Sequence, residues 1–342
     1  LDFNCYHTIV IMLHTVYFNN AAKARFDPSV VTTGVACIEK DPWDMNAEGD
    51  KERVRELYAQ VIGSTKDDIA IMPSTAFAIT LAAHNLKASA KPGKILLLQD
   101  QYPSAVYPWQ DLCKTTHGKF ALDIVPYPNE SETWTSLILE RLSLPDSDII
   151  IACLPPLFWC DGSKVDLETI GPLCKEKDIV LIVDATQATG IYPIHVKNIQ
   201  PAIMASSVHK WLRGPSGCCL VYLDPSVVEA WKPLDQHDRS RDWHGRSISD
   251  RGMLTPTGYP DGFLPGARKL DAGGRTQPIL MPMLRAALEK VALLDTVQAQ
   301  TQLRSLMQPL RDWTAQSAQV RPLPESDAYA NHIFGLEIKG AS

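Results

Sequence analysis

The chain lacks an excess of positive charge. Its 342 residues include 33 lysines and arginines against 39 aspartates and glutamates, which gives a formal net charge of −6. Proteins that bind nucleic acid or an anionic membrane usually carry a basic surface, and no run of basic residues suggests one here. We therefore expect no nucleic acid and no membrane among the partners of this protein.

Cysteine pairs of the kind that bind metals are also missing. None of the eight cysteines forms a Cys-x-x-Cys pair, and no histidines cluster at zinc-like spacing, so we predict no metal site. In a chain of this length, such cysteines are usually free, buried thiols in a reducing compartment. We therefore expect a cytoplasmic protein.

Long hydrophobic runs and a targeting signal are absent from the N-terminal stretch. The apolar run T-I-V-I-M-L (8–13) is too short to span a bilayer and lacks the flanks of a signal peptide. We predict that it is an early strand or the arbitrary start of a fragment.

Short apolar runs alternate with helix-like stretches through the middle of the chain. Helices are predicted at 134–142 and 167–177. Continuous apolar strands separated by helices indicate an α/β fold with a mostly parallel sheet covered on both faces. The bounded predicted strands are 94–98, 122–127, 148–154, 179–184, 202–207 and 218–223, and a further strand is predicted within D-D-I-A-I-M (67–72), where it runs into a helix.

The later part of the chain has a different character. Residues 232–266 are predicted to form a long irregular excursion, and 278–310 to be helical. Residues 332–338, H-I-F-G-L-E-I, alternate like a strand and are followed by almost nothing that could pair with it. We expect a C-terminal region that is cut short.

Two polar residues follow predicted strands, where α/β sheets bind ligands. Asp184 ends I-V-L-I-V-D; it could pair with a protonated pyridine nitrogen or, equally, cap a following helix. Lys210 follows A-I-M-A-S-S, in V-H-K-W. Burial there would lower its pKa and leave a neutral amine able to form a Schiff base, although a lysine commonly extends into solvent instead.

Two further strand ends carry suitable groups for the same ligand. Ser74 and Thr75 stand at a predicted helix start, which could bind phosphate or simply be capped. Tyr102 could stack on a flat ring or belong to the core. A phosphate cradle, a stacking ring, a carboxylate and an unusual lysine together match the needs of pyridoxal 5′-phosphate.

Three motifs now carry a resemblance: S-S-V-H-K-W-L-R-G-P-S-G (206–217), D-A-T-Q-A-T-G (184–190) and Q-Y-P-S-A-V-Y-P-W (101–109). From about residue 16 onward the chain resembles the class V aminotransferases. These are pyridoxal phosphate-dependent enzymes of fold type I. They include cysteine desulfurases, selenocysteine lyases, kynureninases and isopenicillin N epimerase-like proteins.

The resemblance implies roles for individual residues. Lys210 would form the Schiff base and move the substrate α-proton, and Asp184 would pair with the pyridine nitrogen. Gln187 would bond the phenolic oxygen of the ring, and Tyr102 would stack on it. Arg275 is a candidate for the substrate carboxylate or a subunit contact, and Trp159 for lining the substrate pocket. The residues implied to bind the phosphate are Ser74, Thr75, Ser207 and His209.

The resemblance also implies an architecture. We expect a large domain (17–295) around a mainly parallel seven-stranded sheet, and a smaller, incomplete α+β domain from 1–16 and 296–342. Family members are homodimers, so Thr255 or Thr257 of the excursion could reach the phosphate of the neighbouring subunit.

Two features differ from cysteine desulfurases. The last cysteine is Cys219, well before the position of their persulfide cysteine, and P-P-L-F-W-C-D-G (155–162) lacks their asparagine. We favour an enzyme that acts on an amino acid through a Lys210 Schiff base, with C–S or C–Se lyase or cysteine desulfurase-like chemistry. Alternatives are an epimerase, an aminotransferase or a non-catalytic, homodimeric remnant. A nucleotide-binding Rossmann protein is disfavoured because no G-x-G-x-x-G follows the first strand.

Overall fold

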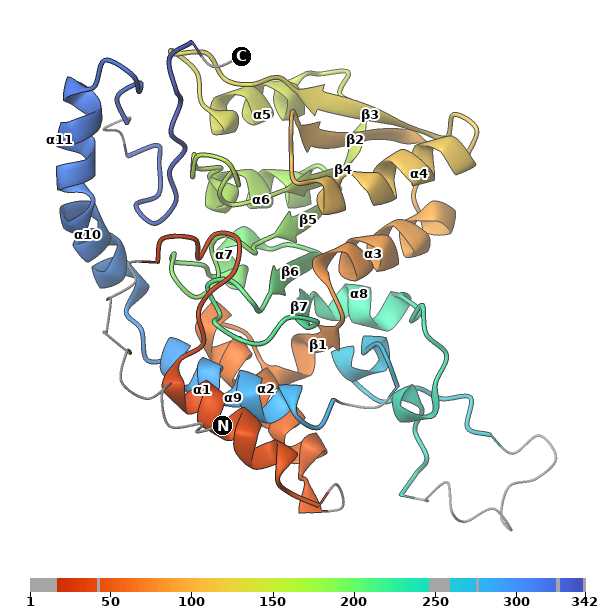
Figure 1. The fold of residues 1–342 in the computed structure, drawn as a ribbon. Helices are drawn as coiled ribbons and strands as arrows, with labels where there is room; N and C mark the ends of the chain where they lie inside the picture. The colour runs from red at the N-terminus through yellow and green to blue at the C-terminus, as the bar shows by residue number, and fades with distance from the viewer. Residues whose placement is uncertain (1–16, 42–43, 246–258, 275–276, 324–326, 341–342) are drawn as a thin grey trace, which may run out of the picture.

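A computed structural model shows a single large sheet flanked by helices (Figure 1). It describes residues 17–41, 44–245, 259–274, 277–323 and 327–340. The predicted early strand at 8–13 lies outside the described residues. The strands are β1 (Ile69–Met72), β2 (Gly93–Leu98), β3 (Phe120–Val125), β4 (Ile149–Leu154), β5 (Val180–Asp184), β6 (Ile203–Ser207) and β7 (Cys219–Leu223).

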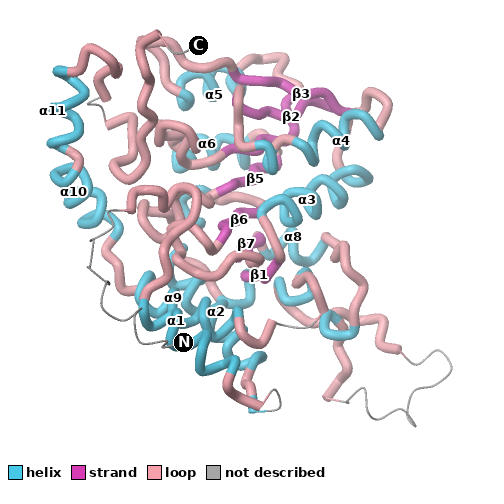
Figure 2. Tube along the Cα trace, in the orientation of Figure 1, coloured by secondary structure: helices cyan, strands magenta, loops and turns pink. Residues whose placement is uncertain are grey.

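Helices connect most of the strands, as the tube view also shows (Figure 2). They are α1 (Pro28–Ile38), α2 (Ala47–Ile62), α3 (Thr75–Ser89), α4 (Tyr107–Thr115), α5 (Trp134–Ser143), α6 (Leu167–Glu176), α7 (Val196–Ile199), α8 (Pro225–Ala230), α9 (Leu280–Val291), α10 (Thr296–Leu306) and α11 (Gln308–Gln316).

The sheet confirms the predicted α/β fold. Its strand order is β1-β7-β6-β5-β4-β2-β3, and only β7 runs antiparallel to its neighbours. Each strand that was predicted from an apolar run is present, with ends that shift by up to two residues. Because β7 is antiparallel to both β1 and β6, the carboxyl ends of the other six strands lie at one edge of the sheet.

Two hydrophobic cores cover the faces of the sheet. One packs α2, α5, α6 and α9 against one face, and the other packs α3, α4 and α8 against the opposite face (Figure 1). β4 is buried along its whole length because both of its faces are covered. The sheet therefore gives rigid support to the loops at its carboxyl edge.

The C-terminal part agrees only partly with prediction. The helical stretch is confirmed, but it is divided where Asp295 accepts bonds from the backbone N–H groups of Val297 and Gln298 and so starts α10. The predicted strand at 332–338 is wrong. Among the described residues this segment forms one bridge, Val320 to Ile338, because only two backbone bonds, Arg321 N–H to Glu337 and Lys339 N–H to Gln319, join it to the neighbouring segment.

The excursion is irregular, as expected, over the residues that the structure describes. Its middle, 246–258, lies outside them, and so do the predicted positions Thr255, Thr257 and Arg275.

Candidate active site

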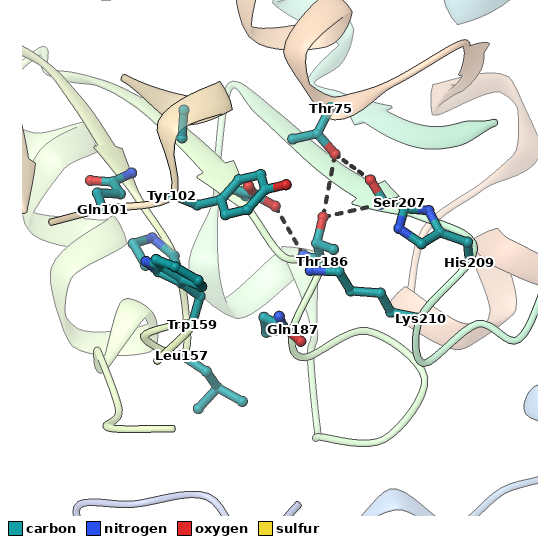
Figure 3. Close-up of a pocket in the computed structure, with 13 residues that line it drawn as sticks. Thr75, Gln101, Tyr102, Leu157, Trp159, Thr186, Gln187, Ser207, His209 and Lys210 are labelled. Carbon is teal, nitrogen blue, oxygen red and sulfur yellow. Dashed lines mark hydrogen bonds between the residues drawn. The ribbon is translucent and has the colours of Figure 1, made fainter. Parts of the chain in front are cut away.

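A pocket opens at the carboxyl edge of the sheet, where the loops after five strands meet (Figure 3). Figure 3 shows Tyr102, Trp159 and Leu157 on one side of it and Ser207, His209 and Lys210 on the other. The lining residues are Thr75, Gln101, Tyr102, Ala105, Pro155, Leu157, Trp159, Asp184, Thr186, Gln187, Ser207, His209 and Lys210.

Lys210 is buried in this pocket, with 8% of its surface exposed. It lies in a tight loop after β6, in which the N–H of Gly214 bonds the carbonyl of Val208 at 2.8 Å. Burial lowers the pKa of Lys210, and the nearby charge of Asp184 opposes that effect. The side chain does not extend into solvent, so the surface-lysine alternative is wrong.

Asp184 is the last residue of β5 and is also buried. Its Oδ1 accepts a bond from the backbone N–H of Thr186 at 3.1 Å, within a turn. The next helix, α7, begins only at Val196, so Asp184 caps no helix. Burial raises the pKa of Asp184, while Thr186 and Lys210 favour the charged form.

Three hydroxyl groups meet where α3 begins. Thr75 Oγ1 lies 2.8 Å from Ser207 Oγ and 3.3 Å from Thr186 Oγ1, and the N–H of Ser207 bonds Thr186 Oγ1 at 3.1 Å. Thr75 is the first residue of α3, where free backbone N–H groups attract anions. This cluster has the donors that a phosphate group needs.

Of the two other residues predicted to bind phosphate, His209 lines the pocket that contains the hydroxyl cluster and Ser74 does not. His209 lines the pocket, and burial lowers its pKa, helped by the positive charges of Lys210 and Lys23. Ser74 is the N-cap of α3: its hydroxyl accepts a bond from the N–H of Phe77 at 3.1 Å. Ser74 therefore caps the helix, which was one of the two roles predicted for it, and it does not line the pocket.

An aromatic pair forms the opposite wall. The Tyr102 and Trp159 rings meet edge to face, with centroids 5.6 Å apart. Trp159 Nε1 donates to the carbonyl of Asp100 at 2.9 Å, which fixes the indole. Gln101 anchors the same loop, because it accepts from the N–H of Leu98 and donates to the carbonyl of Cys153.

The side-chain amide of Gln187 has one defined orientation. Its Oε1 accepts from Trp211 Nε1 at 2.8 Å, and its Nε2 donates to the carbonyl of Ala21 at 3.0 Å. An indole N–H can only donate and a carbonyl can only accept, so the amide oxygen and nitrogen cannot be exchanged. The second N–H of the amide has no hydrogen-bond partner among the described residues.

Most of the predicted site residues come together in this pocket. Sequence reasoning missed Gln101, Thr186, Leu157 and Trp211, although Thr186 lies inside the D-A-T-Q motif and Trp211 directly follows Lys210. Among the described residues, no group of three or more acidic, histidine or cysteine side chains could bind a metal ion. No helix of the described chain is long and apolar enough to cross a membrane.

Residues 16–239 match the sequence pattern of the family described as aminotransferase class-V. The chain belongs to this family. The class V aminotransferases are pyridoxal 5′-phosphate-dependent enzymes, as the resemblance predicted. The match ends before α9, α10 and the C-terminal segment.

Curated class V relatives include two that act on sulfur compounds by name. The chain is 26% identical to a probable cysteine desulfurase of Mycoplasma genitalium over 54% of this chain and 44% of that protein. It is 27% identical to the hercynylcysteine sulfoxide lyase of Schizosaccharomyces pombe, over 52% of this chain and 46% of that protein. The chain spans about half the length of the curated relatives it matches.

Solved class V structures share the fold. The apo cysteine desulfurase of Thermococcus onnurineus superposes with a TM-score of 0.80 at 17% identity, over 95% of this chain and 79% of that one. The predicted fold type I architecture is therefore confirmed.

Proposed function

We propose that this protein binds pyridoxal 5′-phosphate in the pocket around Lys210 and cleaves a C–S bond of an amino acid substrate. The observation that carries the cofactor part is that a buried amine, Lys210, and a buried carboxylate, Asp184, line one pocket beside an aromatic wall. Among the residues that the structure describes, neither group forms a salt bridge that would offset the cost of burying its charge.

The residues of the pocket fit the cofactor group by group. Lys210 would hold it covalently through its amine, and Asp184 would keep its pyridine nitrogen protonated. The hydroxyls of Thr75, Thr186 and Ser207, with His209, would bind the phosphate. The free N–H of Gln187 suits an anionic ring oxygen, because at that position the amide can only donate.

When bound, the cofactor supplies an electron sink that makes the bonds at Cα of an amino acid labile. Lys210 would take the proton from Cα, since burial favours its neutral form. Tyr102, whose ring centre lies 5.2 Å from Lys210 Nζ, would exclude water from the amine. Trp159 would border the substrate side chain.

The C–S assignment rests on the D-x-x-Q and S-x-H-K motifs and on relatives named for sulfur chemistry. The same pocket could serve an epimerase or an aminotransferase, because the residues around the cofactor do not distinguish which bond reacts. A fourth possibility is a protein that binds the cofactor without turnover.

The first experiment tests the cofactor. The purified protein is titrated with pyridoxal 5′-phosphate, and its visible absorption is recorded before and after borohydride, beside Lys210→Ala. We expect a band that borohydride abolishes and that the variant lacks. A wild-type protein without such a band would refute the cofactor proposal.

A second experiment identifies the reaction. Cysteine, cystine and cysteine S-conjugates are incubated with the loaded enzyme and a thiol acceptor, and pyruvate, ammonia, alanine and the released sulfur compound are quantified. Equal amounts of pyruvate, ammonia and the sulfur compound indicate C–S cleavage by elimination, and alanine in an amount equal to the sulfur transferred to the thiol indicates C–S cleavage of the desulfurase type. Solvent deuterium at Cα without these products indicates an epimerase, and amino-group transfer to an added keto acid indicates an aminotransferase.

We also propose a cytoplasmic homodimer. Exposed apolar side chains on α1, Val31, Val35 and Ile38, are suited to a subunit contact, and the described cysteines are all free. Light scattering on the purified protein measures the subunit number, and a monomer at micromolar concentration would contradict the dimer.

A further inference from the structure

The C-terminal segment touches the loop that carries Gln187. His332 Nε2 lies 2.8 Å from the backbone carbonyl of Gln187. Its other ring nitrogen, Nδ1, lies 2.8 Å from Gln300 Nε2, on α10. The His332 ring also meets the indole of Trp211 edge to face, with centroids 4.6 Å apart and an angle of 84°.

The contacts of Gln300 determine which ring nitrogen of His332 carries the hydrogen. Gln300 Nε2 donates to the carbonyl of Ile191 at 3.0 Å, and its Oε1 accepts from the N–H of Asn331 at 2.9 Å. These two partners fix the amide orientation, so Gln300 can only donate to His332 Nδ1. His332 Nδ1 must therefore accept this bond, so the neutral ring is protonated at Nε2 and donates to the backbone carbonyl of Gln187.

The protonation state agrees with this arrangement. Burial lowers the pKa of His332 to about 4, so the ring is neutral near pH 7. A charged ring would also carry a hydrogen on Nδ1. That hydrogen would face an amide hydrogen of Gln300, so this contact would join two donors and no acceptor. The network is consistent only with the neutral ring.

His332 thus supports Gln187 at two points. It bonds the Gln187 backbone directly, and its ring packs against Trp211, which in turn bonds Gln187 Oε1. Both His332 and Gln300 lie outside the segment that matches the family pattern, 16–239. Their role is therefore not implied by the motifs around Lys210.

We propose that His332 is a positioning residue, oriented by Gln300, which holds Gln187 and Trp211 so that the free amide N–H of Gln187 points into the pocket. This inference rests on the proposed cofactor site for its consequence, although the network itself does not require a bound cofactor. In this role the C-terminal segment would control the orientation of a hydrogen-bond donor at the cofactor pocket.

The first test measures the effect on cofactor binding. His332→Leu removes the donor, whereas His332→Gln retains an amide donor of similar reach. We expect the dissociation constant for pyridoxal 5′-phosphate to rise about tenfold in His332→Leu, with a shifted visible band, and to stay within about threefold of wild type in His332→Gln. The control is His84→Leu, at an exposed position on α3. Wild-type affinity and band in a folded His332→Leu would overturn the proposal.

The second test needs no cofactor. Proton–nitrogen correlation spectra of protein labelled with ¹⁵N-histidine report the tautomer of His332 near pH 7. We expect a neutral ring with hydrogen on Nε2, lost in Gln300→Leu and retained in Gln298→Leu, an exposed position on the same helix. A charged ring or the opposite tautomer would overturn the network. If wild type binds no cofactor, the proposed function fails, and these spectra decide the network by themselves.

Discussion

The side-chain nitrogen of Lys210 lies 5.2 Å from the centre of the Tyr102 ring. The two residues follow different strands, β6 and β2, so the sheet and not the local sequence brings them together. The ring covers the amine on the side of the pocket that Trp159 borders. A buried amine whose pKa is lowered by burial is typical of functional sites, which supports the proposed role of Lys210.

Removal of the buried carboxylate should stabilise the cofactor-free protein. We expect Asp184→Asn to raise the free energy of unfolding at pH 7 by about 1 kcal/mol, because asparagine has no charge to desolvate and can still accept from Thr186. The folded-state pKa of Asp184 is raised, so stability from this group is present at low pH and is lost as the pH rises through that pKa. Urea unfolding at several pH values measures the difference.

The pH dependence tests the cause of this stabilisation. The increase in the free energy of unfolding caused by Asp184→Asn should be small below pH about 4 and grow above it. Asp146→Asn, at an exposed position, should show no such trend. Cofactor binding should weaken in Asp184→Asn by about tenfold or more, since the pyridine nitrogen loses its anionic partner. A gain in stability together with unchanged cofactor affinity would argue against the pairing.

The hydroxyl cluster can be tested with a substitution of the same shape. Thr75→Val removes the group that bonds Ser207 and Thr186, and we expect cofactor affinity to fall about tenfold. Thr75→Ser keeps the hydroxyl and should retain most of the affinity. The readout is an absorbance titration with pyridoxal 5′-phosphate. Equal affinity in the valine and serine variants would mean that the phosphate binds elsewhere.

Trp159 should affect the substrate more than the cofactor. Trp159→Ala removes the edge-to-face contact with Tyr102 and the bond to Asp100, so we expect KM to rise about threefold to tenfold. Trp159→Phe keeps the ring contact and should have a smaller effect. Steady-state kinetics with the substrate found by the amino acid screen measures both. A change confined to cofactor affinity would remove Trp159 from the substrate pocket.

A buried ion cluster anchors β1, the strand that leads to Thr75. Asp271 is salt-bridged to Arg55 and to Lys51, at 2.7 Å for Lys51, and its Oδ1 accepts from the N–H of Ile71 in β1. We expect Arg55→Met to lower the free energy of unfolding by roughly 3 kcal/mol, because a buried carboxylate loses a partner. Urea denaturation measures the loss.

The matched control is Arg53→Met. Arg53 is exposed on the same helix, paired with Glu56, and its loss should cost less than about 1 kcal/mol. Burial alone would raise the pKa of Asp271, but Arg55 and Lys51 hold it below its usual range. Its stabilising contribution is therefore present at neutral pH and is lost as the pH falls through the folded-state pKa. An Arg55→Met protein as stable as Arg53→Met would contradict this account.

Much of the fold could be read from periodicity. Continuous apolar runs such as 148–154 predicted buried strands because a strand covered on both faces has no polar side. The strand predicted at 332–338 failed because alternation describes only one strand, whereas pairing requires a neighbour of similar length. Among the described residues, only two backbone bonds join the segment to the chain around Val320.

The sequence alone determined the residue types that the site uses and their positions after strands, because parallel strands all deliver their carboxyl ends to one edge. Lys210, Asp184 and Tyr102 were found in this way. Only the tertiary structure decided that Ser74 caps α3, that Thr186 joins the hydroxyl cluster and that His332 supports Gln187. Those contacts join residues from loops and helices far apart in the chain, and hydrogen-bond geometry depends on how these elements pack, which no local pattern records.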